Sequence, residues 1–247
     1  IGGWAKVTSD ALVGAARGII TWFSLDGDQY AITGTNKKLY VYQNGAWSDI
    51  TPIRSTADAI TQFETTASSS NVSVTDAAHG AIEGDFVTIT SATAPTSSSI
   101  TASELQGEFE IQSVTSTSVY VITSKGTEGG TGRTGGSATA EYQINTNPAV
   151  SILGYGWGAG PWGGVSGGPG WGTSRASLAA PNSVELDSGK WSLDNWGEDL
   201  LAQQLNGGLY YWDTSAGTGT AATSTTVSNA PTKSRFALVS GTDRHVV

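Results

Sequence analysis

The sequence predicts an all-β protein, a partial β-propeller of antiparallel meander blades with a small β-barrel or sandwich domain inserted. Runs of β-branched and aromatic residues, separated by Gly, Asn and Asp, recur along the chain, while helical periodicity is hard to find. Charged residues make up only 13% of the 247 residues, so an ion-paired helical domain is not expected. Two distant stretches also share one order of strands and turns.

The first repeat covers residues 22–42 and the second covers residues 191–212. In both, Ser-Leu-Asp is expected to enter the first turn, and Leu-Tyr-x-aromatic closes the unit. A third copy begins at Phe236 and stops in mid-strand, so we expect the chain to be part of a longer polypeptide. Repeated meanders are typical of propeller blades, because one blade cannot bury both faces alone. Trp191 and Trp196 are expected in the blade core.

The sequence predicts three parts along the chain. Residues 1–60 are expected to form the first propeller part and residues 61–145 the inserted β-domain. Residues 146–247 are expected to form the second propeller part, which is truncated at its C-terminal end. The insert's connections 92–103 and 125–136 are rich in Ser, Thr and Gly, and we expect them to be mobile. Five short strands are expected in the insert, at 71–75, 85–90, 108–114, 118–123 and 138–144.

A glycine-rich stretch, 154–173, alternates Gly with aromatic residues and is expected to be a long loop, because Gly loses the most freedom on ordering. Its aromatic rings are candidate binding or interface groups. They could stack on sugars or bases, or they could fill gaps between blades and dock against a neighbouring subunit. We favour the second role, because the acidic chain shows no basic patch. The four aromatic candidates are Tyr155, Trp157, Trp162 and Trp171.

The formal charge of -9 argues against tight binding to nucleic acid, which depends on Lys and Arg at phosphates. An acidic surface still lets double-stranded DNA pass without adhering. The absence of Cys excludes disulfides and thiolate sites. The best apolar stretch, 11–23, contains Arg17 and is too short to span a bilayer, so no membrane insertion is expected.

The sequence predicts no catalysis. A glycosidase needs two carboxylates across a cleft, but Asp194, Glu198 and Asp199 have the spacing of solvated turn residues. A Ser-His-Asp site would need one of the two histidines, His79 or His245, and neither lies beside a nucleophile motif.

No metal or cofactor is expected either. Asp26-Gly27-Asp28 has two carboxylates in the manner of a calcium loop, but no further acidic ligands follow, and Asp-Gly is a strong hairpin-turn signal. The glycine-rich segments 126–136 and 154–173 lack the Gly-Lys-Ser/Thr ending of a phosphate-binding loop.

Several stretches resemble phage tail structural proteins of the nozzle or tail-hub type. The insert, with Ala78-His79-Gly80 followed by Gly84–Val87, is similar to small β-domains that phage tail proteins carry as insertions. The resemblance covers most of the chain, although a full family member continues beyond it. The other stretches that carry it are Leu39–Pro52, Gly154–Gly164, Trp191–Leu200 and Asp243–Val247.

The resemblance implies a non-catalytic virion protein, a propeller-like tail component assembled as a ring, commonly a hexamer, around the channel through which the genome leaves. It implies as partners other copies of the chain, tail proteins such as portal, adaptor or fibres, and double-stranded DNA in transit. The alternative is a receptor- or glycan-binding β-module of a virion or secreted protein, with the glycine-aromatic loop and the insert as its contact surface.

Overall fold

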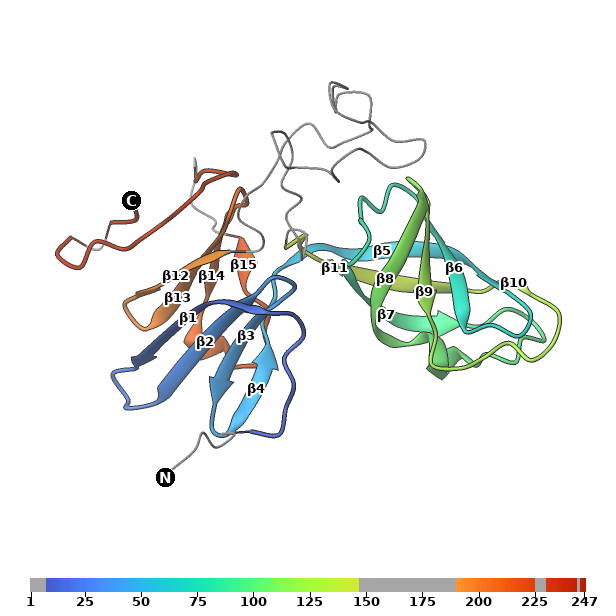
Figure 1. Cartoon of the computed structure of the whole chain (residues 1–247), viewed down its shortest axis with the longest axis horizontal. Helices are drawn as coiled ribbons and strands as arrows, with labels where there is room; N and C mark the ends of the chain where they lie inside the picture. The colour runs from blue at the N-terminus through green and yellow to red at the C-terminus, as the bar shows by residue number, and fades with distance from the viewer. Residues whose placement is uncertain (1–7, 147–189, 225–229, 244) are drawn as a thin grey trace, which may run out of the picture.

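The computed structural model describes residues 8–146, 190–224, 230–243 and 245–247 (Figure 1). Over these residues the regular structure consists of β-strands in three sheets and two 3-10 turns, Ala102–Leu105 and Thr214–Ala216. The all-β class is therefore confirmed. No helix in the described ranges is long and apolar enough to cross a membrane.

The first sheet, here the first meander, has four antiparallel strands in the order β1-β2-β3-β4. Asn44 and Gly45 join β3 to β4 with positive φ angles of 52° and 89°, as a two-residue type I′ turn requires. Gly27, with φ of 90°, lies in the turn between β1 and β2. The strands are Ala16–Phe23, Gln29–Thr35, Leu39–Gln43 and Ala46–Asp49.

The second meander repeats this order with β12 (Trp191–Trp196), β13 (Asp199–Gln204), β14 (Leu209–Trp212) and β15 (Thr223–Ser224). The prediction that the two repeats share one arrangement is confirmed. The expected alignment of their Ser-Leu-Asp motifs is wrong: Ser24 begins the turn after β1, whereas Ser192 to Asp194 lie inside β12. The reason is that β12 continues to a tight turn at Gly197, where φ is 74°.

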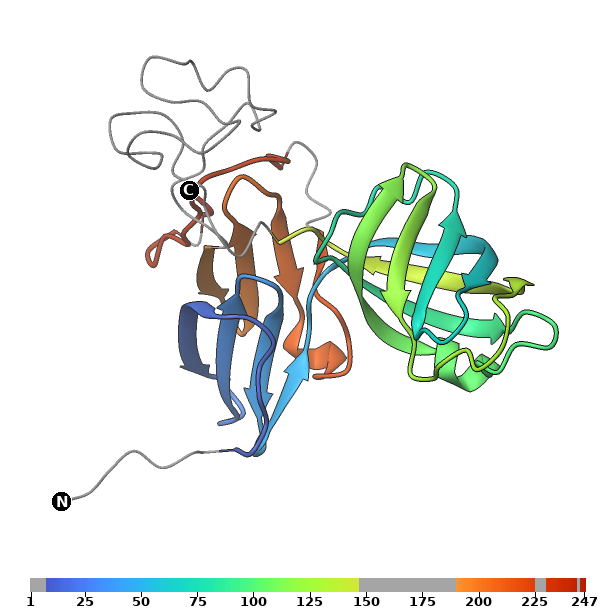
Figure 2. The ribbon, with the colours of Figure 1, turned by 45° about the vertical axis from the view of Figure 1, so that its right-hand side comes forward.

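The two meanders pack against each other over one apolar core (Figure 2). Trp191 is 6% exposed and lies against Gly34, where an added Cβ would be 2.4 Å from Trp191 Cδ1. Its Nε1 donates to Thr35 O at 2.8 Å. The expectation of a core position is thus correct for Trp191 and wrong for Trp196, which is 36% exposed on the opposite face of its sheet. The core comprises Trp22, Tyr30, Ile32, Leu39, Val41, Ile50, Ile144, Trp191, Leu200, Ala202, Trp212 and Ala222.

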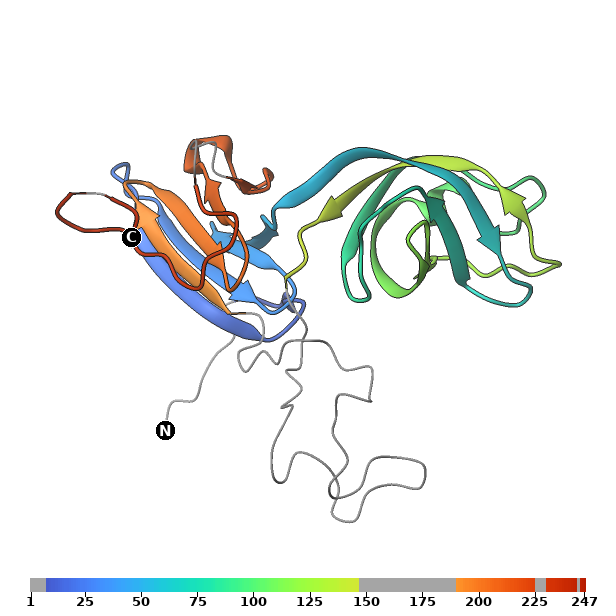
Figure 3. The same ribbon diagram turned by 90° about the horizontal axis from the view of Figure 1, so that it is seen from above.

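The residues expected to begin a third copy, here the C-terminal segment, lie on the other face of the second meander, where the described ones form an isolated bridge and no strand. Val239 and Val246 form an antiparallel bridge, and Ala237 packs against Leu201 and Leu209. The stack therefore runs from the first meander through the second to the C-terminal segment (Figure 3).

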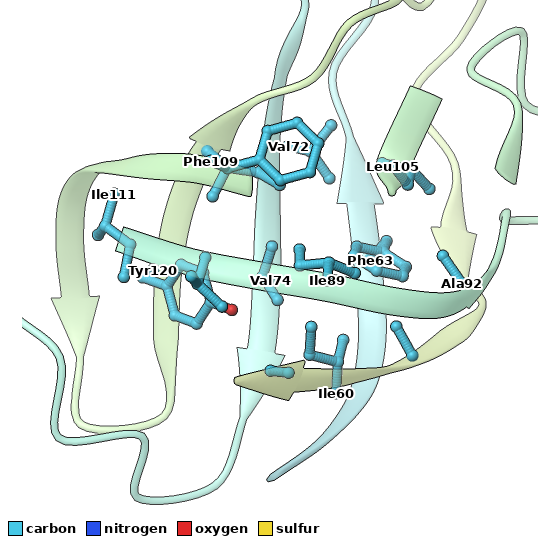
Figure 4. Packing of buried hydrophobic residues seen from close by; sticks show 14 of the residues in the cluster. Ile60, Phe63, Val72, Val74, Ile89, Ala92, Leu105, Phe109, Ile111 and Tyr120 are labelled. Carbon is cyan, nitrogen blue, oxygen red and sulfur yellow. The ribbon is translucent and has the colours of Figure 1, made fainter. Parts of the chain in front are cut away.

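The third sheet is a barrel, closed because β5 pairs with β6 as well as with β11. Its interior is filled by apolar residues (Figure 4), which alternate with outward residues as the two-residue period of strands requires. The barrel strands are β5 Ile53–Thr65, β6 Asn71–Asp76, β7 Phe86–Thr93, β8 Gly107–Ser116, β9 Val119–Thr123 and β11 Ser137–Gln143, and β10 Thr134–Gly135 adds to β5.

Five of the barrel strands lie where strands are expected from the sequence, whereas β5 and the two-residue β10 were not expected. β5 begins at Ile53, whereas the expected border of the insert is at residue 61. The alternation of apolar and polar residues that marks a strand is interrupted in β5, because its pairing with β6 has a register shift between Ile60 and Gln62.

The barrel's two long connections, expected to be mobile, are tied together by Glu128. Its buried carboxylate accepts hydrogen bonds from Ser98 Oγ at 2.7 Å, Ser99 N at 3.1 Å and Thr65 Oγ1 at 2.9 Å. These donors, led by Ser98 and Ser99, lower the pKa of Glu128 to about 2.

Candidate assembly surfaces

The predicted aromatic candidates Tyr155, Trp157, Trp162 and Trp171 lie outside the described residues. Four other regions lie within the described residues. They are the junction between the barrel and the first meander, a polar cluster inside the barrel, and the two outer ends of the meander stack.

A buried lysine joins the first meander to the barrel. Lys38, in the turn between β2 and β3, is 2% exposed. Its Nζ lies 2.6 Å from Asp49 Oδ2 at the end of β4 and 2.5 Å from Glu108 Oε1 on β8 of the barrel. The same Nζ lies 4.3 Å from the centroid of the Phe86 ring on β7. One cation therefore holds groups from both parts of the fold.

A glutamine from a third barrel strand completes this junction. Gln143 Nε2 donates to Asp49 Oδ2 and to Glu108 Oε1, each at 3.1 Å. Burial alone would raise the pKa of Asp49, but the charge of Lys38 and hydrogen bonds from Lys38 and Thr51 hold that pKa below its usual value. Lys37 pairs nearby with Glu110, but both of these side chains are partly exposed. The arrangement fixes the barrel against the meander.

Inside the barrel, buried polar groups satisfy one another. Tyr142 OH donates to Asp76 Oδ2 at 2.6 Å and lies 3.0 Å from Tyr120 OH. Burial raises the pKa of Asp76, opposed by the hydrogen bond from Tyr142. Arg54 lies over the Tyr142 ring at 4.8 Å. This cluster stabilises the barrel interior.

His79 belongs to the same cluster and is fully engaged with the backbone. Its Nδ1 accepts from Ala81 N at 3.0 Å, so the proton of the neutral ring belongs on Nε2, which lies 3.2 Å from Ser116 O. Because both ring nitrogens are in use, this histidine does not have the free nitrogen that a general base needs. The other histidine, His245, lines an apolar cleft.

The three carboxylates considered for hydrolysis each accept a hydrogen bond from a backbone N–H group. Asp194 accepts from Val239 N at 2.8 Å and so anchors the C-terminal segment. Glu198 accepts from Leu25 N at 2.7 Å and joins the first turns of the two meanders. Asp199 accepts from Thr214 N at 2.9 Å. In the part of the chain that the structure describes, no group of three or more His, Cys, Asp or Glu is placed to hold a metal ion.

The outer face of the first meander carries protruding apolar side chains. Along β1, Ile20 and Trp22 point into the shared core, whereas the alternate residues Ile19 and Phe23 are 71% and 69% exposed. The turn that follows carries the exposed carboxylates Asp26 and Asp28. We call Phe23 and this turn, residues 23–28, the acidic knob.

The opposite end of the stack contains an apolar cleft of about 330 Å³ between the second meander and the C-terminal segment. Two exposed cations, Lys233 and Arg235, flank Ser234 at its wall. Gln203 Oε1 and Ser234 Oγ are buried without a hydrogen-bond partner. The apolar lining includes Trp196, Leu201, Leu209, Phe236, Ala237 and Val246.

Comparison with known proteins leaves the chain without an assigned family. No protein-family model and no curated protein matches it. A solved structure, the phage phi92 endosialidase, aligns with a TM-score of 0.25 and 12% identity over 90% of this chain and 32% of that one. The chain thus spans about a third of that protein's length, and a likeness of this size supports neither a shared fold nor a shared function.

Proposed function

We propose that this chain is a non-catalytic structural component of a phage tail, of the nozzle or hub type, that forms a ring around the DNA exit channel. The observation that carries the proposal is the direct packing of two sequence-distant meanders. Trp191 of the second meander donates to Thr35 of the first, 156 residues earlier in the chain. Sheets stacked in this way are the repeating unit of propeller-like proteins.

The first meander offers a surface for assembly, because its outer face is uncovered by the other described residues. The second meander has both faces covered, one by the first meander and one by the C-terminal segment. The first meander instead leaves Ile19 and Phe23 exposed on its outer face. Two large apolar side chains exposed on one face of an edge strand are candidate contact residues for a neighbouring copy. Neighbouring copies in a ring would cover them.

The charge of the chain fits a wall along which DNA moves. With a formal charge of -9, the surface repels phosphate, so DNA would pass without adhering. In this proposal part of the acidic surplus lines the channel.

The barrel fits the role of a rigid arm that contacts other tail proteins, such as portal, adaptor or fibres. It lies to one side of the meander stack (Figure 1), and Lys38 clamps it there through Glu108. Lys38 is buried while its carboxylate partners are partly exposed, so moving the barrel away would leave chiefly the lysine charge uncompensated.

The virion itself tests the proposal. Peptides of this chain should occur in a mass-spectrometric digest of purified particles of the phage that encodes it, and immunogold labelling with antibodies against the chain should mark the tail. Absence of the peptides from particles whose other tail proteins are detected would refute the assignment. Binding of a monomeric chain to a glycan array, with no label on the tail, would favour the glycan-binding alternative.

A further inference from the structure

The two ends of the meander stack differ in form, since one carries an exposed aromatic side chain and the other contains an apolar cleft. One end presents the acidic knob with Phe23 exposed, and the other end contains the apolar cleft between Trp196 and Phe236. A cleft walled by aromatic rings suits an aromatic side chain, because ring pairs add stabilisation beyond the area they bury.

The knob and the cleft also lie at the same level of the stack. Phe23 is the last residue of β1 and pairs with Gln29, the first residue of β2. Trp196 is likewise the last residue of β12 and pairs with Asp199, the first residue of β13. A second copy added along the stack direction would therefore bring its knob to the level of Trp196 along the strands.

Charge favours the same contact. The knob carries the exposed residues Asp26 and Asp28. The exposed residues Lys233 and Arg235 do not line the cleft themselves but flank its lining residue Ser234 in the chain. Two copies of a chain with a formal charge of -9 repel each other over most of their surfaces. A pair of cations beside an apolar cleft is the place where an acidic knob of another copy would be attracted.

We propose that the acidic knob of one copy docks into the apolar cleft of the next copy, with Phe23 entering between Trp196 and Phe236. The two aspartates of the knob then face Lys233 and Arg235. Because different surfaces of the two copies meet, the contact is head-to-tail, and repetition gives a closed ring or an open filament. This inference deepens the proposed ring assembly and rests on it.

Sedimentation velocity of the full chain, over about a hundredfold range of concentration, tests the contact. The wild-type mass should rise with concentration. Two charge-reversed variants, Asp26→Lys/Asp28→Lys and Lys233→Glu/Arg235→Glu, should each associate at least about tenfold more weakly. The equimolar mixture of the two variants should associate again, because each reversed surface then meets a complementary one. Thermal melting and circular dichroism confirm that each variant is folded.

Two further variants separate the proposed contact from a general effect of net charge. Phe23→Ser should weaken association without altering charge. Glu64→Lys/Glu83→Lys changes the net charge by the same amount as the first reversal but lies on the exposed barrel surface, so it should leave association unchanged.

Two results would overturn the inference. One is a single-chain mass for the wild type at every concentration, and the other is association that survives both charge reversals. If either result were found while peptides of this chain were present in purified virions, the proposed contact would be refuted and the tail assignment would be kept. Absence of the peptides together with rescue in the mixture would keep the interface and remove the tail assignment.

Discussion

Replacing Lys38 with Met would test whether one buried cation couples the barrel to the meanders. Met keeps much of the apolar length of the side chain and removes only the charge. Removing one partner of a fully buried ion pair costs about 3 to 5 kcal/mol. Here Lys38 is 2% exposed, but its partners Asp49 and Glu108 are 28% and 40% exposed, so water compensates them in part. We therefore expect a loss of about 2 to 3 kcal/mol.

Urea denaturation with two probes measures this loss. No tryptophan lies within residues 53–143, so tryptophan emission does not report on the barrel, while far-UV circular dichroism reports on the whole chain. Five tryptophans lie in the meander strands: Trp22, Trp47, Trp191, Trp196 and Trp212. In the wild type the two transitions should coincide, as for one cooperative unit. In Lys38→Met they should separate, because the barrel and the meanders then unfold independently.

Lys37→Met is the matched control. It removes the same charge one residue away, but Lys37 and its partner Glu110 are partly exposed, so we expect a loss below about 1 kcal/mol. Equal losses for the two variants, or coincident transitions in Lys38→Met, would refute the view that Lys38 couples the two parts.

Three further perturbations address the barrel. Glu128→Gln should lower the melting temperature at neutral pH. Folding depresses the pKa of Glu128, so the stabilisation that its carboxylate gives is fully present above the unfolded pKa of about 4.3. This stabilisation should fade as the pH drops toward the folded pKa of about 2. At that pH, mutant and wild type should have the same melting temperature. Tyr142→Phe leaves buried Asp76 without its donor and should cost about 1 to 3 kcal/mol in urea denaturation, whereas an unchanged midpoint would contradict the buried hydrogen bond. Replacing residues 54–142 with a short Gly-Ser linker should leave native tryptophan emission, because the flanking residues pair as neighbours, and loss of all folded material would argue against an autonomous barrel.

Local signals allowed much of the fold to be predicted from the sequence. Asn44-Gly45 marks a hairpin by turn chemistry alone, and the alternating residues of β6 mark a half-buried strand. The two meanders could be matched because Leu39 and Leu209 begin equivalent strands after comparable turns.

Long-range contacts escaped prediction for physical reasons. The local sequence around Lys38 is typical of a solvated turn, and it gives no sign of the partner Glu108, which lies 70 residues away in the sequence. Glu128 lies in a stretch of polar and glycine residues, and only the closed barrel brings Ser98 beside it. Trp196 was wrongly expected in the core because β12 runs on past its Ser-Leu-Asp motif, which places this ring on the outer face.

The packing of the two meanders through Trp191 underlies the proposed assembly, and a double-mutant cycle with Gly34→Ala and Trp191→Ala measures it. Trp191→Ala should cost about 3 to 5 kcal/mol, whereas Trp196→Ala, at a 36% exposed site, should cost far less. Gly34→Ala should cost about 1 to 3 kcal/mol, because its Cβ would lie 2.4 Å from Trp191 Cδ1. In the Trp191→Ala background the same change should cost less, because the ring contacts at 2.4 and 2.5 Å are gone and only the 2.9 Å contact with the Cβ atom of residue 191 remains. The expected coupling is about 1 to 2 kcal/mol. Additive losses, with no coupling between the two sites, would contradict the packing on which the proposed assembly depends.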